Sequence, residues 1–237
     1  MENALEIIGL RKSRGNFSVD VSFNLPKGFI MGFVGKNGAG KTTTIKAILN
    51  MINKDAGEIK IFGKDNVLHE SEVKQKIGVV MDSAFFEENW KLTQVGQILK
   101  PFYTNWCDNR FKELLQKFSL DANKKVKELS RGMKMKIMIA AALAHDPDLL
   151  ILDEPTSGLD AVARDELMEI LQSFIGDKDK SILFSTHITS DLEKIADYIT
   201  FINDGKIIDS DKKDALLEKY GCTLDEMVVR VNKGGIK

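Results

Sequence analysis

The feature that most constrains this chain is the stretch GKNGAGKT at residues 35–42, which fits the phosphate-loop pattern G-x-x-x-x-G-K-[ST]. The apolar run 29–34 before it predicts a buried strand, and residues 42–51 predict a helix. Glycines let such a loop wrap around phosphates with its N–H groups pointing inward, and the helix adds the positive end of its dipole. We therefore expect a nucleoside triphosphate site built from Gly35, Asn37, Gly38, Ala39, Gly40, Lys41, Thr42 and Thr43.

An acidic strand supplies the second half of the expected chemistry. The sequence LLILDEP at 149–155 predicts a buried central strand that carries two carboxylates at its C-terminal end. Asp153 could hold Mg²⁺ opposite the Thr42 hydroxyl, and Glu154 could polarise the attacking water. Lys41 could reach the β- and γ-phosphates. Together these residues predict a Mg²⁺-dependent nucleoside triphosphatase.

Three further motifs narrow the class of hydrolase. LSRGM at 129–133, before an apolar helix predicted at 134–144, resembles the Leu-Ser-Gly-Gly-Gln signature of ATP-binding cassette (ABC) ATPases. SGLD at 157–160 and STH at 185–187 are similar to the D-loop and the switch histidine of that family. The resemblance spans roughly residues 5–205 and identifies an ABC nucleotide-binding subunit. The signature is most similar to those of ABC-2-type exporters and bacitracin-transporter-like systems.

The resemblance implies site residues, a cofactor and partners. Lys41, Glu154 and His187 would be catalytic, with His187 sensing the γ-phosphate of ATP, and the cofactor would be Mg²⁺. Ser130 stands at an expected helix N-cap, and with Gly132 it would bind the ATP of a second cassette. Two cassettes, identical or different, would thus sandwich two ATP molecules. A polytopic membrane permease would hold the chain, as a peripheral subunit, at the cytoplasmic face of the cell membrane.

The sequence departs from the family pattern at three places. Asp82 stands where a glutamine is usual, and its carboxylate is a candidate ligand of Mg²⁺. The tyrosine that usually stacks on adenine would fall near Arg14, so that Phe17 or the Arg14 guanidinium could stack instead. Within the signature, Arg131 replaces a glycine and Met133 replaces the glutamine.

The order of predicted elements indicates an α/β fold, with a P-loop NTPase core and a mostly parallel sheet. Alternating residues at 5–10 and 17–25 predict an N-terminal antiparallel β subdomain, and the middle of the chain is mainly helical, as in the helical subdomain that the resemblance implies. The expected division is an ATP-binding core at 1–83 and 145–221, an inserted helical subdomain at 84–144, and a C-terminal tail at 222–237 without a predicted element.

Large aromatic residues gather at the start of the predicted insert. We expect most of them to pack in its core and a minority to line a groove, because exposed aromatic clusters are typical of docking sites. In the family this region receives a coupling helix from the membrane subunit. The residues are Phe85, Phe86, Trp90, Phe102, Tyr103 and Trp106.

Composition limits the remaining possibilities. A net charge of −1 gives no reason to expect a nucleic-acid partner. Cys107 and Cys222 are too few and too far apart for a disulfide framework or a zinc site. The longest apolar run, 137–144, is far shorter than the ~20 residues of a membrane helix, so a membrane role would come through a partner.

Two alternatives to a transporter subunit can be weighed. A soluble ABC ATPase acting on ribosomes or DNA is the rival function. The single phosphate loop argues against tandem translation factors, and an insert without sustained heptads argues against coiled-coil relatives. A GTPase could use NKDA at 53–56 to read guanine, but that motif should follow the acidic strand. We predict the ATP-hydrolysing subunit of a multi-subunit ABC transporter, and more specifically of an exporter.

Overall fold

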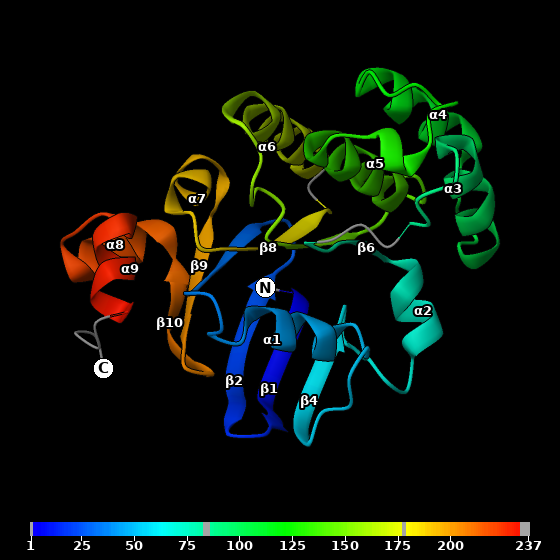
Figure 1. Cartoon of the computed structure of the whole chain (residues 1–237). Helices are drawn as coiled ribbons and strands as arrows, with labels where there is room; N and C mark the ends of the chain where they lie inside the picture. The colour runs from blue at the N-terminus through cyan, green and yellow to red at the C-terminus, as the bar shows by residue number, and fades with distance from the viewer. Residues whose placement is uncertain (1, 83–85, 177–178, 233–237) are drawn as a thin grey trace.

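The computed structural model describes residues 2–82, 86–176 and 179–232, in which a sheet lies between layers of helices (Figure 1). Its strand order is β5-β4-β1-β2-β10-β9-β3-β8-β7-β6. The parallel part consists of β9 (Tyr198–Asn203), β3 (Ile30–Val34), β8 (Ser181–Thr186), β7 (Leu149–Asp153) and β6 (Ile77–Val80). The antiparallel part consists of β5 (Lys64–Asp65), β4 (Ala56–Ile61), β1 (Asn3–Arg14) and β2 (Phe17–Pro26).

Strand β10 (Lys206–Lys212) joins the two parts of the sheet. It runs antiparallel to β9 and meets β2 in parallel through a single residue pair, Lys206 with Asp20. The predicted α/β class is therefore confirmed, with both parallel and antiparallel pairs in one continuous sheet.

Side chains of β3 alternate between two apolar clusters, one on each side of the sheet. Met31 and Phe33 pack with helices α1 (Lys41–Ile48) and α2 (Glu70–Gln75), whereas Ile30 and Val34 pack in the opposite cluster. That opposite cluster also takes residues from α3 (Leu92–Leu99), α4 (Asp108–Lys117), α5 (Arg131–Leu143), α6 (Ala161–Ile175), α7 (Thr189–Ile195), α8 (Lys213–Tyr220) and α9 (Leu224–Asn232). Strands β3 and β7 are buried along their whole length. Their sequences are almost entirely apolar because helices cover both faces of this part of the sheet.

Several element predictions need correction. The helix predicted at 42–51 ends at Ile48, because Asn50 adopts a left-handed backbone with φ 53°. Helices α2 and α7 were not predicted, and α9 occupies the tail in which no element was expected. The boundary expected between residues 83 and 84 lies outside the described residues, so the division into subdomains stays a prediction. Among the described residues of the predicted insert, 3₁₀ turns lie at Lys100–Phe102 and Val126–Glu128.

The aromatic residues of the insert are mostly packed, as expected. Phe86, Trp90 and Trp106 are partly buried against the large cluster, whereas Phe102 is 68% exposed. Tyr103 stacks on buried His145 with ring centroids 3.9 Å apart. Phe85 lies outside the described residues. None of the described helices is both long and apolar enough to cross a membrane.

The stacked pair of His145 and Tyr103 ties the helical region to strand β6. A ring nitrogen of His145, Nε2, lies 3.1 Å from the carbonyl oxygen of Ile77. Burial lowers the pKa of His145 to about 4, so the imidazole is neutral at neutral pH. This histidine therefore serves packing.

Candidate nucleotide site

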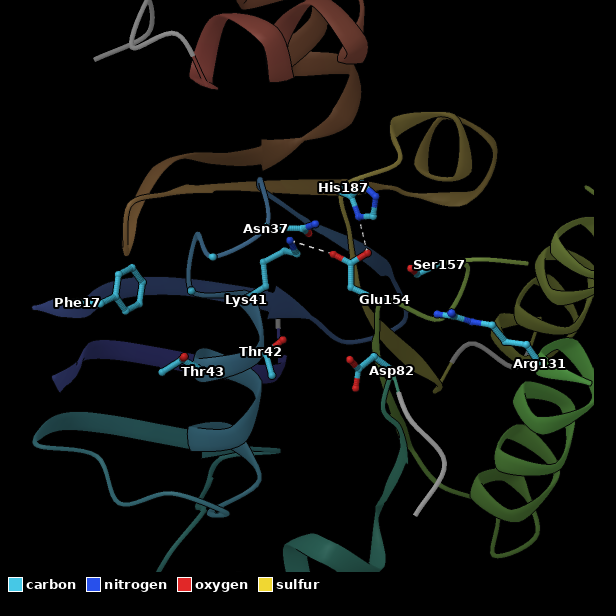
Figure 2. Close-up of a pocket in the computed structure, with 12 residues that line it drawn as sticks. Phe17, Asn37, Lys41, Thr42, Thr43, Asp82, Arg131, Glu154, Ser157 and His187 are labelled. Carbon is cyan, nitrogen blue, oxygen red and sulfur yellow. Dashed lines mark hydrogen bonds and ion pairs between the residues drawn. The ribbon is translucent and has the colours of Figure 1, made fainter. Parts of the chain in front are cut away.

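The C-terminal ends of β3, β7 and β8 meet at one edge of the sheet, where a pocket of about 550 Å³ opens (Figure 2). This is the edge at which parallel α/β sheets bind ligands. The phosphate loop follows β3, the acidic pair ends β7, and the switch histidine follows β8. The lining residues are Phe17, Asn37, Gly38, Gly40, Lys41, Thr42, Thr43, Asp82, Arg131, Glu154, Ser157 and His187.

The phosphate loop is held in a conformation that requires glycine. Gly40 has φ 113°, and a Cβ atom there would lie 3.0 Å from Val19 and 3.3 Å from the ring of Phe17. The Ala39 N–H donates to the carbonyl of Lys36 at 3.1 Å, and its carbonyl accepts from Gly205 at 2.9 Å. The loop is thus tied both to itself and to the turn between β9 and β10.

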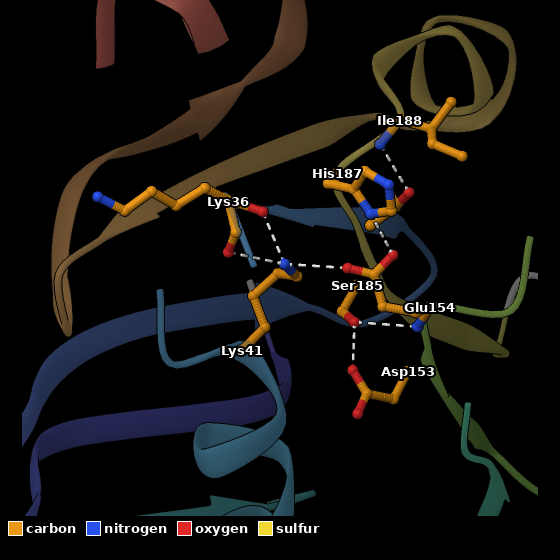
Figure 3. Close-up of polar contacts among 9 residues, drawn as sticks. Lys36, Lys41, Asp153, Glu154, Ser185, His187 and Ile188 are labelled. Carbon is orange, nitrogen blue, oxygen red and sulfur yellow. Dashed lines mark hydrogen bonds and ion pairs between the residues drawn. The ribbon is translucent and has the colours of Figure 1, made fainter. Parts of the chain in front are cut away.

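Lys41 is buried beneath the loop and contacts three oxygen atoms. Its Nζ lies 2.9 Å from Glu154 Oε1, and it donates to the carbonyl oxygens of Gly35 at 2.6 Å and Lys36 at 3.2 Å (Figure 3). Two of the three donors of the ammonium group thus have carbonyl acceptors, and Glu154 is its ion-pair partner. A phosphate entering the pocket would compete with Glu154 for this cation.

Glu154 is held between a cation and an imidazole. Its Oε2 lies 2.7 Å from Nδ1 of His187, on the side opposite Lys41 (Figure 3). The backbone has φ 51°, a strained conformation for a residue other than glycine, and such strain clusters at functional sites. The Glu154 N–H donates to the carbonyl and the hydroxyl of Ser185, at 3.1 and 3.2 Å. Glu154 is therefore held through both its backbone and its side chain.

Asp153 is completely buried, and one of its oxygens lacks a protein partner. Oδ1 accepts a hydrogen bond of 2.6 Å from the Ser185 hydroxyl, while Oδ2 has no hydrogen-bond donor among the described residues. A buried, unpaired carboxylate oxygen is costly unless a cation or water satisfies it. With the Thr42 hydroxyl on the pocket wall, this oxygen fits a hard cation such as Mg²⁺. Asp82, the third expected metal ligand, lines the same pocket and has no ion-pair partner in the described ranges.

The structure does not bring every expected residue to this pocket. Gly35 and Ala39 belong to the loop but do not line the cavity, and the expected metal ligand Asp153 is buried beneath the lining. Ser130 and Gly132 also lie outside the lining, although Ser130 caps α5 as predicted, accepting a hydrogen bond of 3.3 Å from the Met133 N–H. Their neighbour Arg131 does line the pocket.

Sequence reasoning missed Ser157 and Ser185 as site residues. Ser157 lies on the pocket wall, and Ser185 binds both residues of the acidic pair. The missed signal was the polar residue near the end of an otherwise apolar strand, since Ser185 pairs in register with Asp153. The NKDA motif is absent from the pocket lining, and its Asp55 pairs with Lys12 of β1 instead.

Comparisons with known proteins agree with this geometry. The family described as ABC transporter matches residues 19–157. The bacitracin transport ATP-binding protein BcrA of Bacillus licheniformis is 34% identical over 98% of this chain and 78% of its own length. The Nod factor export ATP-binding protein I of Ralstonia nicotianae is 32% identical over 94% of this chain and 72% of its own length.

A solved structure, described as an ATP-binding subunit of an ABC transporter, has a TM-score of 0.87 with 28% identity. It covers 96% of this chain, and 98% of that structure is matched. The predicted resemblance to ATP-binding subunits of bacitracin-transporter-like systems is thereby confirmed. The chain belongs to the ABC transporter family and is one of its ATP-binding, ATP-hydrolysing subunits.

Proposed function

We propose that this chain drives a multi-subunit exporter by binding a polytopic permease at the cytoplasmic face of the cell membrane. The relatives described above are named for bacitracin transport and Nod factor export. Those names favour transport over a soluble ATPase acting on ribosomes or DNA. The chain would be a peripheral subunit, because none of its described helices is able to span a bilayer.

The observation that carries the proposal is the Glu154 carboxylate shared between Lys41 and His187 at 2.9 and 2.7 Å. Phosphates of ATP would bind the loop amides and attract the Lys41 ammonium. Because that cation also holds Glu154, phosphate binding would release one carboxylate oxygen toward the pocket. The freed oxygen would orient the attacking water and take up its proton, while His187 keeps the carboxylate in place.

Attack of this water would be in line with the bond that breaks between the β- and γ-phosphates of ATP. Little covalent chemistry is required of the protein, so positioning and electrostatic stabilisation would supply most of the rate. Lys41 and the N-terminus of α1 would counter the negative charge that moves onto the leaving ADP.

A magnesium ion would be held by Thr42 and Asp153, with Asp82 as a further ligand. The unpaired Oδ2 of buried Asp153 supports this assignment. Bound Mg²⁺ neutralises charge on the β- and γ-phosphates. Ser185 would act as a positioning residue, because its hydroxyl fixes the other oxygen of Asp153.

Ser130 and Gly132 would serve the ATP of a second cassette, in a homodimer or a heterodimer. They belong to the N-terminal turn of α5, a helix of 13 residues, and neither lines the pocket of their own chain. Free N–H groups at such a helix end attract anions. Two cassettes facing each other would therefore complete two sites, each with one phosphate loop and one signature turn.

Hydrolysis by Glu154→Gln tests this proposal. The purified wild-type chain should hydrolyse ATP slowly alone and faster with its permease. The variant should lower both rates by about 10²–10⁴-fold, because the water loses its base, and should still bind ATP. It should accumulate as an ATP-bound dimer, detected by gel filtration with and without ATP.

Glu113→Gln, an exposed change on α4, is the matched control and should keep the wild-type rate. An unchanged rate in Glu154→Gln would remove this residue from the mechanism. If no permease altered the wild-type rate, the result would favour the alternative function, a soluble ABC ATPase acting on ribosomes or DNA.

A further inference from the structure

Helix α7 follows the switch histidine and is too short to hold its own place. It has seven residues and begins at Thr189, two positions after His187. Isolated helices of this length are unstable in water, so α7 depends on the contacts of its buried side chains. One of these, Leu192, lies where β3 has a glycine, because a Cβ atom at Gly32 would lie 2.6 Å from Cδ1 of Leu192. The helix thus packs directly on the backbone of the strand that leads to the phosphate loop.

The segment between β8 and α7 is held where the strand ends. The Ile188 N–H donates to the Thr186 hydroxyl at 2.9 Å, and His187 lies between these two residues in the chain (Figure 3). The His187 side chain is 40% exposed, and its Nδ1 lies 2.7 Å from Glu154 Oε2. Because solvent surrounds part of the imidazole, its direction depends on how the backbone on either side is held. Thr186 holds one side, and Thr189 begins the other.

Helix α9 supports that other side. Its buried residues Leu224, Met227 and Val231 share one face of the helix and are at most 3% exposed. They belong to the same apolar cluster as the buried apolar residues of α7. Toward the other end of α9, the Val231 carbonyl accepts a hydrogen bond of 3.3 Å from Asn203, the last residue of β9. The helix is therefore fastened to the sheet as well as to α7.

A polar contact joins α9 to the first residue of α7. The Thr189 hydroxyl donates to Asp225 Oδ1, and Thr189 is only 6% exposed. Buried hydroxyl groups need a partner, and the carboxylate supplies it here. Asp225 is fixed in turn, because Thr223 and Glu226 exchange hydrogen bonds of 3.1 and 3.3 Å at the start of α9. The start of α7 is thus tied to a defined helix end.

We propose that Asp225 is a positioning residue for ATP hydrolysis. Through Thr189 it holds the start of α7, and so keeps the His187 imidazole against Glu154. The inference rests on the role proposed above for His187. Neither Thr189 nor Asp225 lines the pocket, so the contact between them should act on the chemical step and not on nucleotide affinity.

Steady-state ATP hydrolysis by the purified chain tests the inference, with every variant at the same protein concentration. Asp225→Ala should lower kcat by about 3- to 10-fold, because a charge-assisted hydrogen bond is lost, and should leave the KM for ATP within about twofold. Thr189→Val removes the same contact from its other end and should have the same effect. Thr189→Ser keeps the hydroxyl and should recover most of the rate. Glu218→Ala, an exposed change on α8, is the matched control and should keep the wild-type kcat.

A double variant separates positioning from stability. His187→Ala should lower kcat by about 10- to 100-fold, since Glu154 loses the group that holds its carboxylate. In that background Asp225→Ala should lower kcat no further, because no imidazole is left to position. Thermal melting measures the structural effect of Asp225→Ala, which should be the same with and without His187.

Other results would overturn the inference. An unchanged kcat in Asp225→Ala would do so, as would a raised KM in place of the lower kcat. A further loss of kcat when Asp225→Ala is added to His187→Ala would show that α9 acts on another part of the site. If Thr189→Val kept the wild-type rate, Asp225 would serve only the start of α9. A wild-type rate in His187→Ala would instead remove His187 from the proposed mechanism, and this inference with it, whatever the rate of Asp225→Ala.

Discussion

The parallel and antiparallel parts of the sheet differ in where they place charge. Strand β7 is buried along its whole length and carries its charge only at Asp153, its last residue. Strand β2 instead alternates, with buried Val19 and Val21 on either side of exposed Asp20. In the parallel part, polar chemistry is therefore concentrated at one edge, whereas in the antiparallel part it faces solvent along the strand.

Two ion pairs show what this difference means physically. Lys41 and Glu154 lie 2.9 Å apart with side chains 5% and 13% exposed, and Lys12 and Asp55 lie 2.8 Å apart with 23% and 44% exposed. The distances are nearly equal, so burial separates them. Water screens the second pair and leaves it little net energy, whereas the first is in a drier site where charges act strongly on a ligand. The ion pair of the parallel part should thus be needed for ATP hydrolysis, whereas the ion pair of similar length in the antiparallel part should not.

Replacing the lysine of each ion pair tests whether burial decides which pair is functional. Lys41→Met should lower ATP hydrolysis by about 10³-fold, because the phosphates lose their cation and the buried Glu154 carboxylate loses its ion-pair partner. Lys12→Met should leave the rate within about twofold and change the free energy of unfolding by less than about 0.5 kcal/mol. Phosphate release and urea unfolding of both variants provide the measurements. Similar losses of activity in the two variants would show that burial does not distinguish the pairs.

Replacing one serine in each part of the sheet tests the same comparison, with a smaller expected effect on ATP hydrolysis. Ser185→Ala should lower activity by about 10- to 100-fold and raise the Mg²⁺ concentration needed for half-maximal rate, because Asp153 loses its fixed orientation. Ser22→Ala in β2 removes a hydroxyl that accepts from the Gly9 N–H at 2.8 Å, and it should leave hydrolysis unchanged. Ser185→Thr, which keeps the hydroxyl, should recover part of the rate.

The Mg²⁺ titration is the decisive readout for Ser185. A purely structural serine would lower stability and leave the Mg²⁺ curve of the folded fraction in place. An unshifted curve for Ser185→Ala would therefore remove its role in positioning Asp153.

Local sequence was sufficient to predict the parallel part and its edge. An apolar run followed by glycines or carboxylates identifies β3 and β7, and Ser130 before an apolar helix identifies its cap. Each of these signals lies within about ten residues of the feature it predicts. The order of motifs along the chain then supplied the family, and with it the approximate site.

Contacts between distant segments could not be predicted in the same way. The ion pair of Lys41 with Glu154 depends on which strands become neighbours, and no local pattern encodes that choice. Helix α7 has only seven residues, too few for periodicity to distinguish it from a loop, and α9 lies in the tail from Cys222 onward, where no element was predicted. Arg131 was recognised only as a departure from a motif, since its direction depends on how α5 packs beside the loop after β7.

Phe17 is the antiparallel part's contribution to the pocket lining, and its replacement should have the smallest effect. The ring lies beside Gly40, 3.3 Å from the position of a Cβ atom there. If adenine stacks on it, Phe17→Ala should raise the KM for ATP by about 5- to 10-fold, the lower end of the about 1–3 kcal/mol that base stacking contributes. The kcat should not change, because the base is remote from the γ-phosphate. Phe17→Trp should keep the wild-type KM, and Phe17→Leu should resemble alanine. A leucine variant that behaves as wild type would mean that the ring only fills space beside the loop. If Phe17→Ala had no effect while Arg14→Ala raised the KM, the guanidinium would be the stacking group, and the antiparallel part would act on the base through charge after all.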